Sequence, residues 1–293
     1  MRSMQNILLV IHPTSATDPA LERGKQLAKA LDAELKVLLC DPHQAQGEYL
    51  EQLLSELRRE GLRAYGEQAM VEPKHSCAAI LAAQQQHNAD LVIKQHHPDS
   101  QLRKLLSPPD DWQLSRQLPV PLLLVKSERP WAGGTILAAM DVDHQDPQHR
   151  MLQGNVMNYA VDLCGLFAAE LHVVSAYDVP SLDLADPVAH HDQAVALYCH
   201  DQCQWFQREY ELAEHRLHIG EGPARALIPR IAHEQGAVLT VLGTIARSGL
   251  EGILIGNTAE AVLDGLESDV LVLKPYEAPA RLAEQSNDRV AYP

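Results

Sequence analysis

The sequence is poor in aromatic side chains and in positive charge. Phe, Trp and Tyr make up 4% of its 293 residues. Any core must therefore be built from Leu, Val, Ile and Ala, which favours an α/β protein over a β-sandwich. Lys and Arg number 24 against 39 Asp and Glu, and the formal net charge is -15. Because an acidic surface repels phosphate backbones, we expect no nucleic-acid partner.

Long apolar runs are also missing. No run approaches the roughly 20 residues that span a bilayer, so we expect no membrane partner. The short apolar run near the start ends in His12-Pro13 rather than at a small-residue cleavage site, and we interpret it as a strand and not a signal peptide. The five cysteines are widely scattered and odd in number, which indicates reduced thiols and a cytoplasmic location.

The main feature of the chain is an internal repeat with a period of about 140 residues, which indicates two domains of one kind. Asn6–Ile11 and Gly134–Asp141 are both apolar stretches near the start of a half. Later segments align without a gap at an offset of 148 residues, so that Ala89–Lys94 lies on Ala237–Leu242. The repeat predicts one domain over 1–127, a linker within 127–134, a second domain over 134–276 and a polar tail over 277–293.

Within each half, continuously apolar strands alternate with helical stretches. Strands that are apolar on both faces are typical of parallel sheets covered by helices on both sides. The predicted fold is therefore α/β, with two tandem doubly wound domains of five strands each. The fifth strands, Pro121–Lys126 and Val270–Lys274, would be apolar edge strands in isolated domains. Pairing them antiparallel would hide both edges, although Pro119 and Pro121 would limit the pairing at one end.

A glycine-rich loop follows the fourth strand of the second half. Its glycines allow positive φ and a close approach of backbone to ligand, and Arg247 supplies a cation. Asn257 and Glu260 have the spacing of an N-cap residue and its N3 partner, so a helix would aim its N–H groups at the loop. The four glycines are Gly243, Gly249, Gly252 and Gly256. The pattern predicts an anion site, although an ordinary strand-to-helix connection would use similar residues.

The segment GTIARSGLEGILIGNTAE, from Gly243 to Glu260, resembles the Gly-x2-Gly-x9-Gly-Ser/Thr motif of the universal stress protein family. Together with the repeat and the strand pattern, the resemblance covers nearly the whole chain and is to members with two domains in tandem. It implies an open five-stranded sheet in each domain and an intrachain pseudo-dimer. In nucleotide-binding members, the adenine of ATP lies near the first two strands and its phosphates lie in this loop.

Carried over position by position, the resemblance implies a set of nucleotide contacts in the second half. Two of them depart from the family motif, since Ala246 replaces the second glycine and Asn257 replaces Ser or Thr. An alanine at a positive-φ position would cost about 1 kcal/mol. The implied contacts are Asp141, Ala176, Leu242, Gly243, Ala246, Arg247, Gly256, Asn257 and Thr258.

The first half lacks this set. Proline removes an N–H donor and an added aspartate repels an anion, so no triphosphate is expected there, and the half is either a structural partner or a pocket for another ligand. At the same offset, Gln95 replaces Gly243, Pro98 replaces Ala246, Asp99 replaces Arg247, Pro108 and Pro109 replace Gly256 and Asn257, and His12 stands in the place of Asp141.

Three histidine or cysteine patterns invite a functional interpretation. Cys199 and Cys203 share a helical face and could hold zinc, but this is also core spacing. His96-His97 could join His12 in a titrating or metal-binding cluster, or be solvated. His218–Glu221 resembles a nucleotidyl-transferase motif but lacks its last histidine. We predict no metal site from them.

No catalytic set can be placed either, because nothing in the sequence supplies a base to a nucleophile. Asp141, Asp143, His144 and Asp146 could bind a cation at a phosphate site, but turn chemistry after a strand also explains them and is favoured for all but Asp141.

The sequence thus predicts a cytoplasmic stress-response protein that binds ATP or another adenine nucleotide, with or without Mg²⁺, in its second half. It would act as a sensor or partner-binding module and not as an enzyme. Two alternatives stay open. One is a slow ATPase or a phosphoryl- or nucleotidyl-transfer enzyme, and the other is a module for a nucleotide sugar or an acyl ligand. Protein partners and a further homodimer are left open as well.

Overall fold

The structure is a computed structural model. It describes residues 4–13, 18–72, 75–96, 109–141, 146–177, 201, 204, 207–244, 246–247, 254–255 and 257–275, with the backbone alone at 246–247, 254–255 and 257–260. The predicted tail and the pair Cys199 and Cys203 lie outside these residues, as do His97, Pro98, Asp99 and Pro108.

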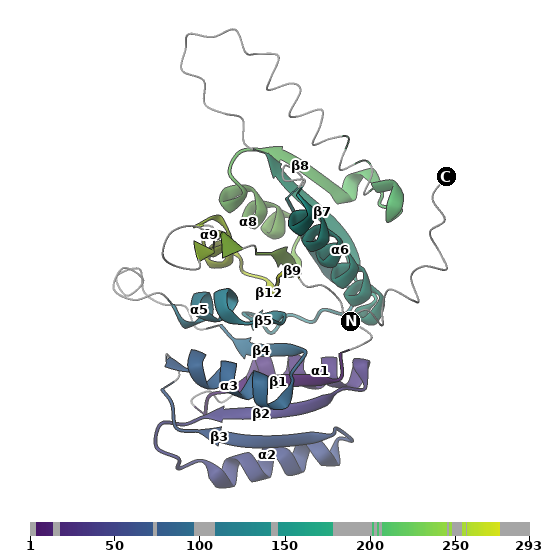
Figure 1. Ribbon diagram of the computed structural model, residues 1–293. Coiled ribbons are helices and arrows are strands. Elements are labelled where there is room, and N and C mark those ends of the chain that lie inside the picture. The colour runs from purple at the N-terminus through teal and green to yellow at the C-terminus, as the bar shows by residue number, and fades with distance from the viewer. Residues whose placement is uncertain are drawn as a thin grey trace.

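Ten strands form one continuous sheet in the order β3-β2-β1-β4-β5-β12-β9-β6-β7-β8, stacked from bottom to top in Figure 1. All neighbours pair in parallel except β5 and β12. The predicted α/β fold of two tandem parallel halves is confirmed. The strands are β1 (Asn6–Ile11), β2 (Glu34–Cys40), β3 (Ala64–Ala69), β4 (Leu91–Gln95), β5 (Leu122–Val125), β6 (Thr135–Met140), β7 (Glu170–Tyr177), β8 (Leu217–Glu221), β9 (Ala237–Gly243) and β12 (Asp269–Leu273).

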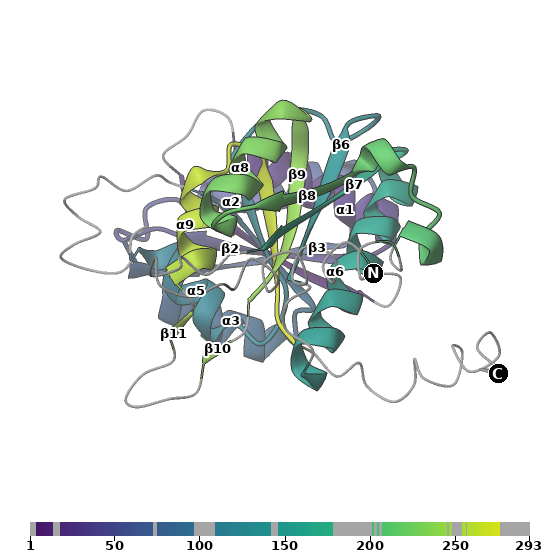
Figure 2. The ribbon, with the colours of Figure 1, turned by 90° about the horizontal axis from the view of Figure 1, so that it is seen from above.

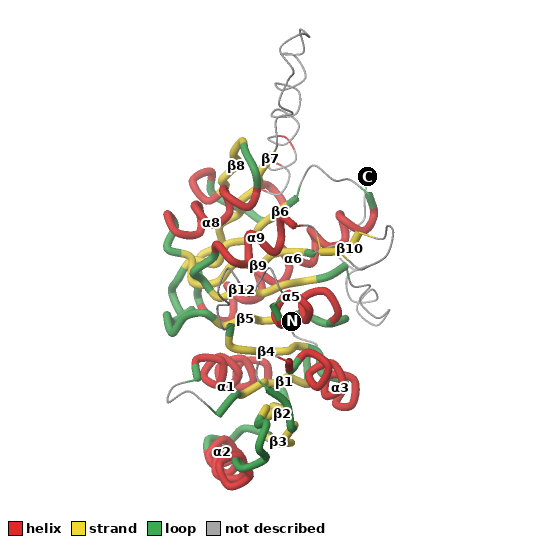
Figure 3. The backbone as a smooth tube through the Cα atoms, turned by 90° about the vertical axis from the view of Figure 1, so that its left-hand side faces the viewer, coloured by secondary structure: helices red, strands yellow, loops and turns green. Residues whose placement is uncertain are grey.

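Helices cover both faces of this sheet, because alternate strand residues point to opposite faces and are apolar on each. One core contains buried residues of α1, α2 and α6, and the other contains those of α3, α5, α8 and α9. Figure 3 shows α1 and α3 on opposite sides of β1. The helices are α1 (Pro19–Leu31), α2 (Gly47–Arg59), α3 (Cys77–His87), α5 (Asp110–Gln117), α6 (Pro147–Phe167), α8 (Ala224–Glu234) and α9 (Asn257–Gly265), with a 3₁₀ turn η2 at Glu214–Arg216.

The two halves join through the predicted pairing of their fifth strands. β5 and β12 run antiparallel, with Leu123 opposite Leu271, and both are fully buried apolar strands. Each strand therefore covers the edge that the other would expose. Both cores run across this junction, so the halves form an intrachain pseudo-dimer.

A pair of lysines repeats across the pseudo-twofold. Lys126 follows β5 and donates from its Nζ to the carbonyls of Leu263 and Leu266 at the end of α9. Lys274, which follows β12, donates to the carbonyl of Arg116 near the end of α5. Each lysine thus supplies a cation to the C-terminal carbonyls of the other half's last helix, where the helix dipole favours positive charge.

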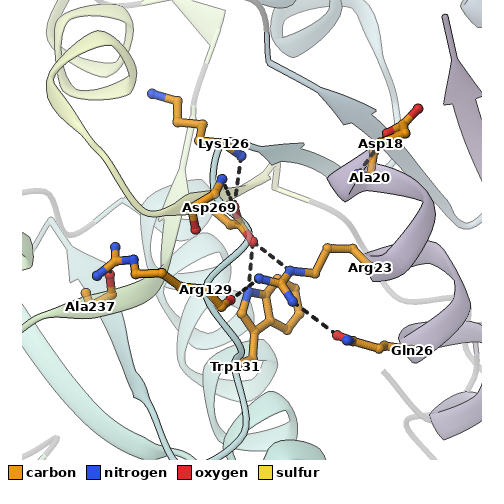
Figure 4. A network of polar contacts seen from close by, with 10 residues as sticks. Asp18, Ala20, Arg23, Gln26, Lys126, Arg129, Trp131, Ala237 and Asp269 are labelled. Carbon is orange, nitrogen blue, oxygen red and sulfur yellow. Dashed lines mark hydrogen bonds and ion pairs between the residues drawn. The ribbon is translucent and has the colours of Figure 1, made fainter. Parts of the chain in front are cut away.

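A third contact between the two halves involves the segment predicted as a linker, residues 127–134. Asp269 of β12 is fully buried, and its carboxylate accepts hydrogen bonds from Arg23 Nε and Trp131 Nε1, both at 2.8 Å. It also accepts from the backbone N–H groups of Lys126 and Ser127 at 2.8 and 3.0 Å. Figure 4 shows α1, the linker and β12 meeting at this carboxylate. The linker is therefore part of the packed junction.

None of the helices within the described ranges is long and apolar enough to cross a bilayer.

Candidate functional site

Three strand ends of the second half meet at one edge of the sheet. Met140 of β6 lies opposite Ser175 of β7, and Ala139 lies opposite Leu242 of β9. The next residue along each of these parallel strands is also a neighbour of the others. Asp141 directly follows β6 and lies beside Ala176 of β7, while Gly243 is the last residue of β9. Neighbouring strands lie about 4.8 Å apart. The structure therefore brings together four of the predicted contacts, namely Asp141, Ala176, Leu242 and Gly243.

This edge is the topological switch point of the second half. The order β12-β9-β6-β7-β8 reverses direction between β9 and β6, and the buried residues of α6, which follows β6, and of α9, which follows β9, lie in opposite cores. The connections after β6 and β9 therefore leave toward opposite faces, which opens a crevice at the carboxyl ends of the strands. Ligands of doubly wound sheets bind in such crevices.

The glycine-rich loop contains a short hairpin that the sequence did not reveal. β10 (Ala246–Arg247) pairs antiparallel with β11 (Leu254–Ile255), and Figure 2 shows the two strands at one end of the molecule. Strand residues ordinarily have negative φ, so the hairpin argues against a positive φ at Ala246.

The conformational interpretation of Gly243 needs correction. Its φ is not in the left-handed region. Instead, a Cβ built on Gly243 would lie 2.5 Å from Cγ and Cδ2 of Leu152, a nearly buried residue of α6. Glycine is needed here because α6 packs directly against the end of β9.

Asn257 and Thr258, two more of the predicted contacts, lie at the end of the loop where α9 starts. α9 begins at Asn257, within one residue of the predicted helix start, and Thr258 is in its first turn. The backbone N–H groups of that turn have no intrahelical partner and favour an anion. Gly256 lies outside the described residues, as do the side chains of Ala246, Arg247, Asn257 and Thr258.

In the first half, the corresponding edge is filled by an ion cluster. Lys94, one residue before the end of β4, is 3% exposed and pairs with Asp111, while Asp110 lies 3.8 Å away. His96 Nδ1 lies 2.7 Å from Asp111 Oδ2, and Ser76 donates to Asp110 at 2.6 Å. The two aspartates form the first turn of α5, the counterpart of α9, so carboxylates stand where an anion would meet the helix.

The charges within this cluster stabilise one another. Burial alone would raise the pKa of Asp111, but the Lys94 charge and the His96 hydrogen bond outweigh it and lower that pKa to about 2. Burial would lower the pKa of Lys94, but attraction from Asp111 and Asp110 raises it. Carboxylates paired with Lys94 therefore stand where an anion would bind, and the absence of a triphosphate from this half stays a prediction. These aspartates were not among the predicted site residues. A lysine that ends an apolar strand, followed by Asp-Asp at a helix start, was the available signal.

The other histidine and cysteine patterns do not form a metal site among the described residues, where no group of three or more metal-binding side chains occurs. Asp146 caps α6, accepting from the N–H groups of Gln148 and His149, which supports the turn interpretation. Cys40 and Cys77 are free and buried, and burial raises the pKa of their thiols to about 12 and about 11. These thiols are therefore unreactive at neutral pH.

His218 lies on β8 and pairs with His172 of β7. Nδ1 of His172 is 3.0 Å from Nε2 of His218, and the rings are nearly coplanar at 13°. One nitrogen must donate and the other must accept, so the pair requires at least one neutral imidazole. Burial, followed by the nearby His218 and Arg216 charges, lowers the pKa of His172. Burial is also the largest cause of the lowered pKa of His218. The charge of Glu234 raises this pKa and the charge of His215 lowers it, both by less than burial does.

This pair predicts a loss of stability on acidification. Both folded pKa values lie below the unfolded value of 6.5, so unfolding takes up protons as the pH falls through that value. The contribution of the pair is present above about pH 6.5 and is lost below it, by at most about 1.4 kcal/mol per pH unit for each proton. We expect His218→Gln to reduce the decrease in unfolding free energy between pH 7.5 and 5.5, measured with urea. The control is His233→Gln, at an exposed histidine, and an equal decrease in both variants would contradict the prediction.

The fold and the edge geometry define a class of protein, a doubled α/β protein with a candidate ligand site at the switch point of its second half. The chain belongs to the Universal stress protein family, whose sequence profile matches residues 4–126 and again 135–274. It is 28% identical to Universal stress protein E of Escherichia coli K12, over 98% of this chain and 100% of that protein. It is 25% identical to the Universal stress protein E homolog of Haemophilus influenzae, over 92% and 97%.

Solved structures agree with this assignment. The crystal structure of a putative universal stress protein from Pseudomonas aeruginosa UCBPP-PA14 is 43% identical and matches with a TM-score of 0.82, covering 98% of this chain and 99% of that one. A universal stress protein from Archaeoglobus fulgidus, 15% identical, matches with a TM-score of 0.65 over 92% and 97% of the two chains. The second likeness concerns the fold alone.

Proposed function

We propose that this protein binds ATP or another adenine nucleotide, with Mg²⁺ as the accompanying ion, at the switch point of its second domain. It would be a cytoplasmic stress-response protein that acts as a sensor or as a module for protein partners. The observation that carries this proposal is the difference between the two equivalent edges. Asp141, Ala176 and Gly243 lie side by side at one edge, whereas Lys94 and Asp111 fill the other.

The asymmetry supports one nucleotide per chain. In the first domain, two carboxylates occupy the first turn of α5 and neutralise Lys94. An incoming triphosphate would meet like charge there. In the second domain, the first turn of α9 contains Asn257 and Thr258 with no acid before Glu260, and helix N-termini favour anions.

The site supports binding better than catalysis. Proton transfer by enzymes needs a base within hydrogen-bond reach of its target, and the residues brought together at the edge offer Asp141 as their only titratable side chain within the described part of the chain. We therefore propose a binding module and not an enzyme. A phosphoryl-transfer enzyme would instead show repeated turnover that falls when Asp141 or Arg247 is replaced.

Calorimetric titration with Mg-ATP tests the proposal. We expect one site per chain in the wild type and at least a 100-fold weaker affinity in Gly256→Val, because a branched side chain would keep the loop backbone from approaching phosphate. The control is Gly165→Val on α6, where an added Cβ meets no atom within 4 Å. Both variants should keep the melting temperature of the wild type within a few degrees.

Either of two results would contradict the proposal. Unchanged affinity in Gly256→Val would place the phosphates away from the loop. The absence of a binding heat with the wild type would exclude ATP as the ligand. The purified protein would then be examined by mass spectrometry for a bound nucleotide sugar or acyl compound.

A further inference from the structure

The first helix of the second domain is longer than its counterpart in the first. α1 has 13 residues and α6 has 21. Their C-terminal ends are equivalent, because Asp32 and Ala168 are both left-handed caps with φ of 51° and 50°. The next strand begins two residues after each cap. The eight additional residues of α6 must therefore lie at its N-terminal end.

This extension reaches past the carboxyl edge of the sheet. Each of these helices runs antiparallel to the strands it connects, so its N-terminal end points toward their carboxyl ends. Eight residues of α-helix add about 12 Å. Figure 2 shows one end of α6 directed toward the end of the molecule where β10 and β11 lie. The first two turns of α6 thus form one side of the candidate site, and α1 has no equivalent of them.

Two buried side chains of the extension contact the site. Leu152, 6% exposed, packs onto Gly243 at the end of β9. Gln153, 7% exposed, donates from its side-chain Nε2 to the backbone carbonyl of Asp141. Neighbouring residues of one helix therefore hold the ends of both strands that flank the switch point. A buried amide that bonds a backbone carbonyl is costly to replace, because the carbonyl then loses its donor.

We propose that Gln153 is a positioning residue of the nucleotide site, which holds Asp141 in place, and that Leu152 closes the α6 side of Gly243. With Leu152 there, the phosphate groups can approach Gly243 only from the side of β10 and α9. Asp141 is exposed at the same edge. This inference rests on the proposed binding of an adenine nucleotide.

Replacing Gln153 by methionine tests the positioning role, because methionine has a similar length and no amide donor. We expect the dissociation constant for Mg-ATP to rise about tenfold. Gln153→Glu should weaken binding further, since a carboxylate would face the carbonyl oxygen of Asp141. The matched control is Gln52→Met, at an exposed glutamine of α2 in the first domain, which should change the constant less than twofold.

A second readout needs no ligand. The ¹³C chemical shift of the Asp141 carbonyl, measured in the free protein by NMR, should move in Gln153→Met and stay unchanged in Gln52→Met. If only the size of the side chain at position 153 mattered, Gln153→Met and Gln153→Glu would bind ATP with equal affinity. That result would contradict positioning by a hydrogen bond.

The two readouts separate this inference from the proposed function. Unchanged ATP affinity in Gln153→Met, with normal binding by the wild type, would overturn the role of Gln153 and leave the nucleotide site intact. The same conclusion follows if the Asp141 carbonyl shift does not move. If the wild type binds no ATP, the proposed function fails, and a moved carbonyl shift would then identify a structural contact only.

Discussion

Asp269→Ala is expected to lower the free energy of unfolding by about 3–5 kcal/mol, the cost of removing one partner of a buried ion pair. Asp269 accepts four hydrogen bonds, and the guanidinium of Arg23 is only 4% exposed beside it. The substitution leaves Arg23 and the indole N–H of Trp131 without this acceptor in a buried site. Urea unfolding followed by circular dichroism measures the loss.

A matched control lies two residues away. Glu267 carries a carboxylate that is 79% exposed, and Glu267→Ala should change stability by less than about 0.5 kcal/mol. The double variant Arg23→Met with Asp269→Ala should lose less than the sum of the two single losses, because both charges are then gone. Equal effects of Asp269→Ala and Glu267→Ala would show that the junction does not depend on this carboxylate.

Asp111→Asn is expected to lower the free energy of unfolding by about 3 kcal/mol at neutral pH. The substitution leaves the buried charge of Lys94 with Asp110, 3.8 Å away, as its remaining acidic partner. Asparagine keeps the volume of the side chain and removes only the charge. The effect should depend on pH with a definite sign. The folded pKa of Asp111, about 2, is below its ordinary value of 3.8, so its contribution is present above pH 3.8 and is lost between pH 3.8 and about 2.

The difference between wild type and Asp111→Asn should therefore be constant above about pH 5 and shrink as the wild-type carboxylate takes up its proton. Unfolding free energies measured from pH 7 to pH 3 check this. Glu51→Ala, at an exposed position of α2, should show a pH-independent difference near zero. A difference for Asp111→Asn that grows on acidification would contradict the sign of the pKa shift.

The pairing of β5 with β12 could be predicted because two apolar edge strands leave few alternatives. Leu122–Val125 and Asp269–Leu273 are buried on both faces, and such strands require neighbours. The helix start at Asn257 was predictable for a similarly local reason, since capping residues lie next to the turn that they stabilise.

Other contacts between elements far apart in the chain could not be predicted from the sequence. The reason for glycine at position 243 is the side chain of Leu152, about 90 residues earlier in the chain, so local rules assigned it to backbone conformation instead. Arg23 and Trp131 contact Asp269 only after both domains have folded. The hydrophobic periodicity of the sequence does not predict such a contact. The extra length of α6 was visible in the sequence as wider spacing between the first two strands, but its contacts with Asp141 and Gly243 were not.

The antiparallel junction has a consequence for synthesis of the chain on the ribosome. β5 ends at Val125 and its partner β12 begins at Asp269, so nearly 150 residues separate them. At translation rates of 5–20 residues per second, the first domain waits roughly 7–30 s for β12 to emerge. During that interval the edge of β5 is uncovered and Arg23 lacks its carboxylate. An uncovered apolar edge can pair with a strand of another chain, so the rate of translation through the second domain sets how long the first domain is open to such mispairing.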